Sequence, residues 1–392
     1  MGLFTRSRTV QRAGATWAEM IPPRGRITGG RRITEENALR QSAVWAALRV
    51  RADILSTLPV DLYRQVGEAQ VEVPKAPFFL SPSTDPNISF KEWMYSSQVE
   101  LDRTGNSIGI IRARDGNGRP AKIDLVTTSD VVVQVRDDVI SYRIKGTQYT
   151  ADDIWHERQF TIAGLPVGLS PIAYAAWSLG MWQSAMEFGT QWFSNNGHIP
   201  SGILQNNAKV LQPGEAAATK ERYKASMQAG DIFVVGKDWD FDLKSAQASD
   251  AKFLELQKYS DVDAVRFFGV PADLIEVDGN RASITYANVT QRNLQFLIIN
   301  MGPAIARRED ALSKITPSPR FVKLNSDAML RMDPKSTSDK LIAEVSGRIT
   351  APSEARALMN RAPFTDEQLA EFDRLFPRAA TPQKTTTIGV TE

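Results

Sequence analysis

The sequence contains no cysteine among its 392 residues. This absence excludes disulfide bonds, thiolate nucleophiles, and zinc or iron–sulfur sites built on cysteine. Histidine is almost as scarce, because His156 and His198 are the only two. Two imidazoles leave little material for a histidine-rich metal site or a catalytic triad. Much of enzyme and cofactor chemistry is thereby disfavoured.

The chain also lacks a large net charge and a long apolar run. Its 47 Lys and Arg residues against 45 Asp and Glu residues leave +2, too little to predict tight non-specific DNA binding from the total. Hydrophobic residues make up 42% and charged residues 23%, as in folded, water-soluble proteins. The first residues lack the apolar core of a signal peptide, and Arg6 breaks a myristoylation motif. The sequence therefore predicts no membrane span, secretion signal or lipid anchor.

Positive charge gathers at the N-terminus. Residues 1–32 contain seven arginines and one acid, Glu19, which gives this stretch +6 and leaves about −4 for the rest of the chain. Prolines and glycines are interspersed, so residues 1–33 predict a flexible basic N-terminal arm. Such an arm either stays in solvent without a partner, or it contacts nucleic acid or an acidic neighbour.

Helical and then strand periodicity follows the arm. Thr34 is a suitable N-cap with acids in the first turn, and apolar residues at helical spacing continue until Pro59, which predicts one helix. Four short β-branched runs then predict an antiparallel meander with Asp137 and Asp138 at a hairpin tip. These runs are residues 107–113, 121–126, 131–136 and 139–144.

The second half of the chain returns to helices around a small α/β module. Ser170 and Pro171 predict the start of a helix over 172–193 that is apolar on several faces, with Glu187 its only charge. A further helix is predicted over 250–268, and a long one over 283–315 with a kink at Gly302-Pro303. Between the first two lie a strand, a helix and two paired strands, at 199–205, 213–228, 231–235 and 239–244. The pattern predicts a mixed α/β (α+β) fold ending in a disordered tail, 377–392.

One stretch carries candidate ligands for a metal or for acid–base chemistry. Asp152, Asp153, His156 and Glu157 occur together, but their spacing matches neither HExxH nor a facial triad. We interpret them as turn carboxylates and a histidine bonded to the backbone. The sequence therefore predicts no catalytic residues, no metal site and no cofactor.

Three tryptophans stand on the apolar helix over 172–193, namely Trp177, Trp182 and Trp192. Tryptophans can stack bases in single-strand channels. On an apolar helix, filling the protein core is the commoner role, and we predict it for these three.

Read in order, five segments resemble the portal proteins of tailed bacteriophages, the head-to-tail connectors, in the short form typical of long-tailed phages and prophages. They are ADILSTLPVDLYR at 52–64, DDIWHERQFTIAGLPVGLSPI at 152–172, FSNNGHIPSGIL at 193–204, FFGVPADLI at 267–275 and GRITAPSEARALM at 347–359. Together they span most of the chain, from about residue 40 to 360.

The resemblance implies a portal fold with a β-rich wing, a two-helix stem, a small α/β clip, a long kinked wing helix and a small helical crown. On this chain residues 34–168 would form the N-terminal part of the wing. Stem helix 1 would follow at 169–196, the clip at 197–249 and stem helix 2 at 250–270. The tunnel loop would be 271–283, the kinked wing helix 284–316, and the wing end and crown 317–376.

The resemblance also implies a function and partners. Such proteins form a homo-dodecameric ring at one capsid vertex, pass double-stranded DNA, dock the terminase large subunit, and later bind head-completion or adaptor proteins. They contact the major capsid protein, assemble in the host cytoplasm, remain in the virion and hydrolyse nothing. The implied DNA-channel residues are Asp278, Gly279, Asn280 and Arg281, and the implied docking residues of the clip are Lys209, Lys220, Arg222 and Lys224.

Two physical arguments agree with this resemblance. A helix that is apolar on several faces suits a ring, where copies of the chain flank each other. A nearly neutral chain suits a conduit, because a strongly basic channel would hold the phosphates. We therefore predict that Asn280 and Arg281 make weak contacts with DNA.

Two other function classes stay open at this stage. One is a magnesium-dependent nuclease using Asp137, Asp138, Asp152 and Asp153, which predicts that these acids converge. The other is a capsid or scaffold component that does not thread DNA, which predicts open assemblies rather than closed rings.

Overall fold

The computed structural model describes residues 33–137, 139–194, 202–208, 210, 212–229, 238–243, 250–275, 286–326, 334–359 and 361–376. Contacts within the chain separate two compact units, Met1–Asn325 and Ser326–Glu392. The predicted basic arm up to residue 32 and the predicted tail lie outside the described residues.

The first predicted helix is two helices. Thr34 caps α2 (Glu35–Ala38), and a break precedes α3 (Ser42–Thr57), which ends before Pro59 as predicted. The break arises because Gln41, with extended backbone, buries its side chain and donates a hydrogen bond from Nε2 to Asp261 Oδ1 at 2.8 Å. A helical pattern in the sequence does not reveal this distant partner.

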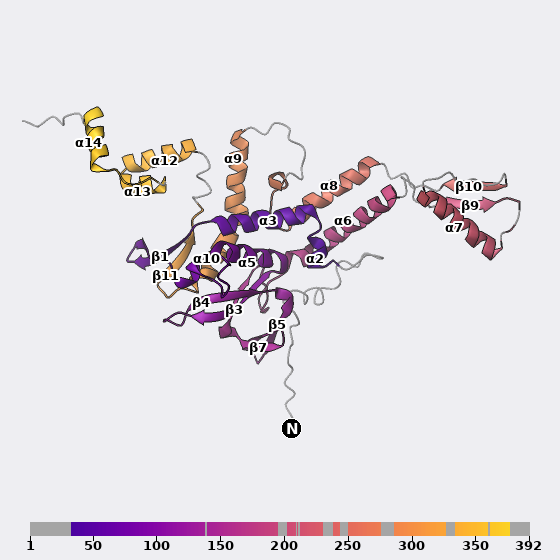
Figure 1. The fold of residues 1–392 in the computed structure, drawn as a ribbon, viewed down its shortest axis with the longest axis horizontal. Coiled ribbons are helices and arrows are strands. Elements are labelled where there is room, and N and C mark those ends of the chain that lie inside the picture. The colour runs from indigo at the N-terminus through magenta and orange to yellow at the C-terminus, as the bar shows by residue number, and fades with distance from the viewer. Residues whose placement is uncertain are drawn as a thin grey trace, which may run out of the picture. The chain divides into compact units, whose positions relative to one another are not determined.

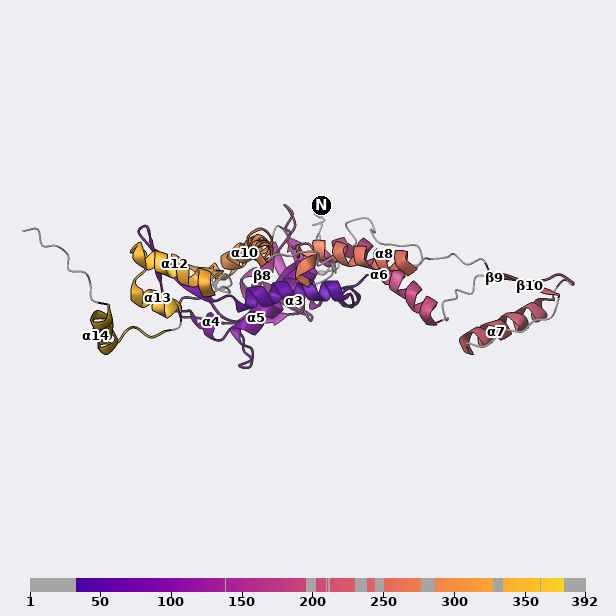
Figure 2. The same cartoon turned by 90° about the horizontal axis from the view of Figure 1, so that it is seen from above.

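Helix α5 (Phe90–Thr104) lies beside α3 and was not predicted. Ser89 caps its start, accepting from the Glu92 N–H at 3.2 Å, and Gly105 ends it in the left-handed conformation. The short helix α4 (Pro77–Leu80) precedes it. Figures 1 and 2 show α3 and α5 among the elements of the first unit.

The four predicted strands are present, but they belong to two sheets instead of one meander. One sheet has the order β4-β3-β8 and the other β5-β6-β7, all antiparallel. The two sheets share a core to which β3, β5, β6 and β8 contribute buried residues, among them Ile108, Val133 and Ile144. The bounds are β3 Asn106–Arg114, β4 Pro120–Val126, β5 Val131–Arg136, β6 Val139–Ile144, β7 Thr147–Thr150 and β8 Ile154–Arg158.

A third sheet joins distant parts of the chain in the order β11-β1-β2. Strand β1 (Val60–Val66) pairs antiparallel with both β2 (Ala69–Glu72) and β11 (Arg320–Leu324). Residues 320–324, which lie in the predicted wing end and crown, are thus hydrogen-bonded to the chain right after α3.

The predicted apolar helix is α6 (Pro171–Ser194), and the helix predicted to follow the small module is α8 (Asp250–Arg266). They pack against each other and lie side by side in Figures 1 and 2. No helix within the described ranges is both long and apolar enough to cross a membrane.

Between α6 and α8 the structure describes β9 (Gly202–Asn206), α7 (Pro213–Ala229) and β10 (Trp239–Leu243). Strands β9 and β10 pair antiparallel, with Phe241 opposite Leu204. The further strand predicted at 231–235 lies outside the described residues.

The predicted kinked helix consists of α9 (Tyr286–Gln295), a π-helical segment η4 (Phe296–Met301) and α10 (Gly302–Ser313). The irregularity comes just before Pro303, which lacks the N–H that a regular helix needs. Helix α10 then packs against β11.

The second unit contains three helices, α12 (Pro334–Ser346), α13 (Pro352–Leu358) and α14 (Asp366–Leu375). Three short 3-10 turns complete the described secondary structure, η1 (Thr128–Asp130), η2 (Ala151–Asp153) and η3 (Ala272–Ile275). Small antiparallel sheets and many helices make up the fold, which confirms the mixed α/β class.

Candidate functional site

Helix α6 has two opposite apolar faces. One face, with Ile172, Ala175 and Leu179, is buried in the first unit. The other, with Tyr174, Trp177 and Met181, is exposed, and Trp177 is 60% exposed. Both sets follow the i, i+3, i+7 spacing of a single helix face. The prediction that Trp177 fills the core is therefore wrong, because its position on the helix points it away from the chain's own core.

Neighbouring elements fix the direction of α6. The Ser170 hydroxyl accepts from the Ala173 N–H at 3.2 Å and donates to the Arg103 carbonyl at 2.6 Å, which ties the start of the helix to the end of α5. Farther along, the Ser178 hydroxyl donates to Asp263 of α8. Helix α8 adds another large exposed side chain, Tyr259, which is 69% exposed. Both helices thus present large exposed side chains that no other described residue of the chain covers.

A buried ion pair attaches the end of α8 to α3 and α5. Arg51 donates from Nε and Nη2 to the two carboxylate oxygens of Asp102, at 3.0 and 3.1 Å. Its Nη1 donates to the Phe268 carbonyl at 2.9 Å, just beyond α8. A bidentate contact between a guanidinium and a carboxylate fixes the relative orientation of the two groups as well as their distance. Arg51 therefore holds three elements in one geometry.

A second buried ion pair attaches α10 to α5 and β8. Arg308 is 0% exposed and lies 2.9 Å from Glu157 Oε2 through its Nη1. The same guanidinium donates to Ser97 Oγ at 2.7 Å and to Gln98 Oε1 at 3.0 Å. Burial raises the pKa of Glu157, and the charge of Arg308 opposes this rise. No sequence pattern had indicated these two ion pairs.

The predicted acid and histidine cluster does not form one site. Asp153 accepts from the Thr150 hydroxyl at 2.6 Å, as a turn carboxylate does, whereas Glu157 faces Arg308. Among the residues described, no three His, Asp or Glu side chains are placed to hold a metal ion. Of the acids proposed for a nuclease, Asp138 lies outside the described residues.

His156 is bonded to side chains, not to the backbone as predicted. Its Nε2 lies 3.0 Å from Asn106 Oδ1, and its Nδ1 lies 3.0 Å from the Tyr142 hydroxyl. Because Asn106 Oδ1 can only accept, Nε2 carries the proton and Nδ1 accepts from Tyr142. Burial lowers the pKa of His156 to about 3, with a smaller contribution from Arg158. The neutral imidazole therefore acts as a structural link between β8, β6 and β3.

This link predicts a pH dependence of stability. Because the pKa of His156 is 6.5 when unfolded and about 3 when folded, the unfolded chain binds the proton more readily. The stabilisation is complete above pH 6.5 and is lost as the pH falls toward 3, by at most about 1.4 kcal/mol per pH unit. Denaturant unfolding at several pH values in wild type and His156→Gln checks this. Groups such as Glu35 contribute equally to both proteins, so an unchanged slope in the variant would contradict the assignment.

The predicted channel and docking residues are only partly within the described chain. Asp278, Gly279, Asn280, Arg281 and Lys209 lie outside the described residues. Lys220 and Arg222 are exposed on α7, which also contains Lys224.

Solved structures share this fold. An HK97-family phage portal protein from Corynebacterium diphtheriae matches with a TM-score of 0.61 and 14% identity, over 78% of this chain and 99% of that one. The neck of a native gene transfer agent particle, computed with C12 symmetry, contains a chain that matches with a TM-score of 0.53 and 18% identity, over 86% and 96%. The fold is thus of the portal class.

The chain belongs to the phage portal protein family, whose sequence model matches residues 42–360. It is 24% identical over 361 residues to the probable portal protein of Streptomyces phage phiC31, covering 86% of this chain and 78% of that protein. It is 25% identical over 360 residues to the portal protein of Enterobacteria phage HK97, covering 87% and 84%. The resemblance noted in the sequence is confirmed, and neither the nuclease nor the scaffold alternative is supported.

Proposed function

We propose that twelve copies of this chain close into a ring at one vertex of a phage or prophage capsid, and that double-stranded DNA passes through the ring during packaging and ejection. The observation that carries the proposal is the exposed apolar face of α6, opposite the face that the chain itself buries. A ring uses heterologous contacts, in which one surface of a subunit meets a different surface of the next. The C12 symmetry of the neck that contains a similar chain supports the same arrangement.

In this arrangement α6 and α8 are the two stem helices, and residues 197–249 form the clip. The exposed Lys220 and Arg222 of α7, together with Lys209 and Lys224, dock the terminase large subunit and later the head-completion or adaptor protein. The ring contacts the major capsid protein, assembles in the host cytoplasm and stays in the virion. It performs no chemistry of its own, because the terminase drives packaging.

Ring formation is tested by substituting Trp177, which is 60% exposed on α6. We expect Trp177→Asp to raise the concentration needed for assembly at least about 30-fold, since buried aromatic anchors are worth about 2 kcal/mol or more at an interface. Electron microscopy and mass photometry across a concentration series measure this. Val139→Asp is the matched control, because Val139 is 66% exposed, close to the 60% of Trp177, but lies on β6. Open sheets or filaments from the unmodified chain, or equal effects of the two variants, would contradict the proposal.

DNA contact is tested separately at Arg281, one of the proposed channel residues in the tunnel loop, 271–283. We expect Arg281→Glu to lower the yield or retention of packaged genome while rings form normally, because a carboxylate repels the passing phosphates. Genome content per particle is the measurement, and Arg281→Lys, which keeps the charge, is the control. An unchanged genome yield in Arg281→Glu would contradict a role for this residue.

A further inference from the structure

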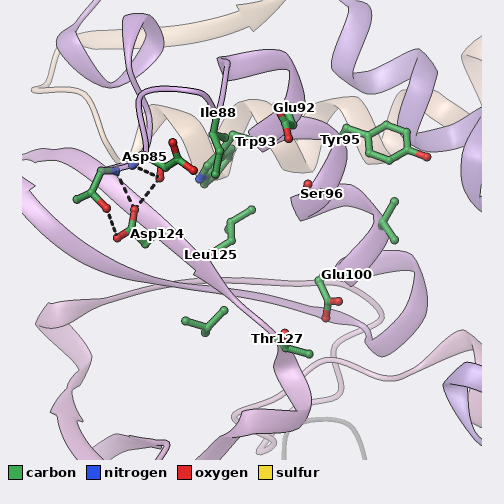
Figure 3. Close-up of a pocket in the computed structure, with 14 residues that line it drawn as sticks. Asp85, Ile88, Glu92, Trp93, Tyr95, Ser96, Glu100, Asp124, Leu125 and Thr127 are labelled. Atoms are coloured by element: carbon green, nitrogen blue, oxygen red, sulfur yellow. Dashed lines mark hydrogen bonds between the residues drawn. The ribbon is translucent and has the colours of Figure 1, made fainter.

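A groove runs along α5. It has a volume of about 590 Å³. Its lining residues come from α5, strand β4 and the segment 83–88 (Figure 3). Glu92, Ser96 and Glu100 follow one another at four-residue spacing and line it from α5. Asp124, Leu125 and Thr127 line it from β4 and the residues after it. We call this cavity the α5 groove.

The α5 groove is acidic. Its lining includes four carboxylates, those of Asp85, Glu92, Glu100 and Asp124, and no Lys or Arg. Asp124 is neutralised from outside by Arg112 at 3.2 Å, and Glu100 by Arg103 at 2.9 Å. In the part of the chain that the structure describes, no Lys or Arg forms an ion pair with Glu92 or Asp85. The groove therefore favours a cationic occupant and repels nucleic acid.

The α5 groove is also partly apolar. Ile88, Val99, Leu125 and Val126 line it between the carboxylates, and the ring of Tyr95 lies at its edge (Figure 3). Tyr95 lines the groove and is half-buried, and aromatic rings attract guanidinium groups. An occupant that suits both features carries arginines interspersed with apolar residues.

The chain itself contains such a segment, and ion pairs connect the residues that follow it to the groove. Residues 1–32 carry seven arginines together with Trp17, Met20 and Ile21. They lead directly to α2, where Glu35 Oε2 lies 3.5 Å from Arg103 Nη2. Arg103 Nη1 in turn lies 2.9 Å from Glu100 Oε1, which lines the groove. Two consecutive ion pairs thus connect Glu35, near the start of the described chain, with Glu100 in the groove.

The N-terminal segment is long enough to reach along the whole groove. Helix α5 has 15 residues, so the groove beside it is no longer than about 22 Å, whereas 32 residues can span up to about 100 Å. Tethering at one end gives a local concentration on the order of 1 mM. A weak intrinsic affinity is therefore enough to fill the groove.

We infer that the α5 groove binds the chain's own basic N-terminal segment, residues 1–32, in the same subunit. Arginines of the segment pair with Glu92 and Asp85, and its apolar side chains cover Leu125 and Ile88. This places the segment on the first unit and accounts for its charge without nucleic acid.

The absence of cysteine allows a direct test in the full-length chain. Ser96 is exposed and lines the groove, so Ser96→Cys provides a single reactive thiol there. We expect maleimide to label this thiol about tenfold more slowly when the segment is bound, as a Kd of about 0.1 mM and a local concentration of about 1 mM would produce. Thr147→Cys, exposed on β7, serves as the reference thiol.

Charge variants of the segment decide the outcome. Replacing Arg24, Arg26, Arg31 and Arg32 by Glu should abolish the protection, whereas replacing the same four by Lys should retain most of it. Adding Glu92→Lys to the Glu variant should restore part of the protection, since opposite charges again face each other. The inference would be overturned if Ser96→Cys were labelled equally fast in all variants. It would also be overturned if the protection did not depend on the charge of the segment.

A second measurement identifies the subunit that supplies the segment. Oxidation of the double variant Ser96→Cys/Arg26→Cys should give a disulfide within one chain, which leaves the monomer mass unchanged on a non-reducing denaturing gel. Cross-linked dimers, or no disulfide at all, would overturn docking within the same subunit.

Discussion

Arg308→Ala is expected to lower the free energy of unfolding by about 3 to 5 kcal/mol, because it leaves a buried carboxylate without its partner. Arg308 is fully buried and faces Glu157 at 2.9 Å. The substitution also removes the hydrogen bonds to Ser97 and Gln98, so that α10 loses its attachment to α5. Denaturant unfolding of the purified chain measures the loss.

The loss of stability in Arg308→Ala should depend on pH and be larger at neutral pH than in mild acid. Burial already raises the pKa of Glu157 above its ordinary value of 4.5, and Arg308 opposes the rise. Without Arg308 the pKa of Glu157 rises further, so the folded variant binds a proton that the unfolded chain releases. The contribution of Glu157 to the stability of the variant is therefore fully present below pH 4.5 and is lost as the pH rises through the folded pKa of this group. The difference from wild type should be larger at neutral pH than in mild acid.

Two controls separate the ion pair from simple truncation. The double variant Arg308→Ala/Glu157→Gln should recover part of the stability and lose the added pH dependence, because neither charge of this pair remains. Lys314→Ala removes the exposed ion pair to Asp310 near the end of α10, and it should cost less than about 1 kcal/mol. A loss in Arg308→Ala no larger than that in Lys314→Ala would refute the assigned role of the buried pair.

Gly105→Ala is expected to destabilise the chain by about 3 to 5 kcal/mol through backbone strain and overpacking together. Gly105 ends α5 at φ +77°, and a Cβ there would lie 2.1 Å from the Leu169 carbonyl oxygen. That oxygen belongs to the segment leading into α6, so the backbone must move to make room. The variant should therefore also impair ring assembly, because it displaces the start of the stem helix.

Gly67→Ala is the matched control for strain alone. Gly67 has a similar φ of +61°, but no atom lies within 4 Å of the position its Cβ would take. We expect a cost of about 1 to 2 kcal/mol there and normal ring assembly. Thermal unfolding and electron microscopy of both variants make the comparison, and equal costs at the two glycines would show that the close approach to Leu169 is unimportant.

Elements with local signals were predictable from the sequence. Ser170 and Pro171 marked the start of α6 within one residue, because capping and the fixed φ of proline act over a single turn. The strands β5 and β6 were predicted at their observed bounds, since their β-branched residues are flanked by turn residues.

Helix α5 escaped prediction for a physical reason. Its buried face includes Ser97, Gln98 and Asp102, which are polar, so hydrophobic periodicity fails on it. These side chains are buried because Arg51 and Arg308 come from other helices to bind them. The N-cap Ser89, with Glu92 three residues later, and the C-terminal Gly105 were signals that could have found it.

The sequence by itself determined the family, the mixed α/β class and most helices and strands, because caps, turns and periodicity are local and five segments keep the family order. The tertiary structure alone decided which charges are buried as pairs, where Gln41 interrupts the first helix, and that Trp177 faces outward. Each of these depends on residues distant in sequence meeting in space. A one-dimensional pattern records the types of such residues but not their partners.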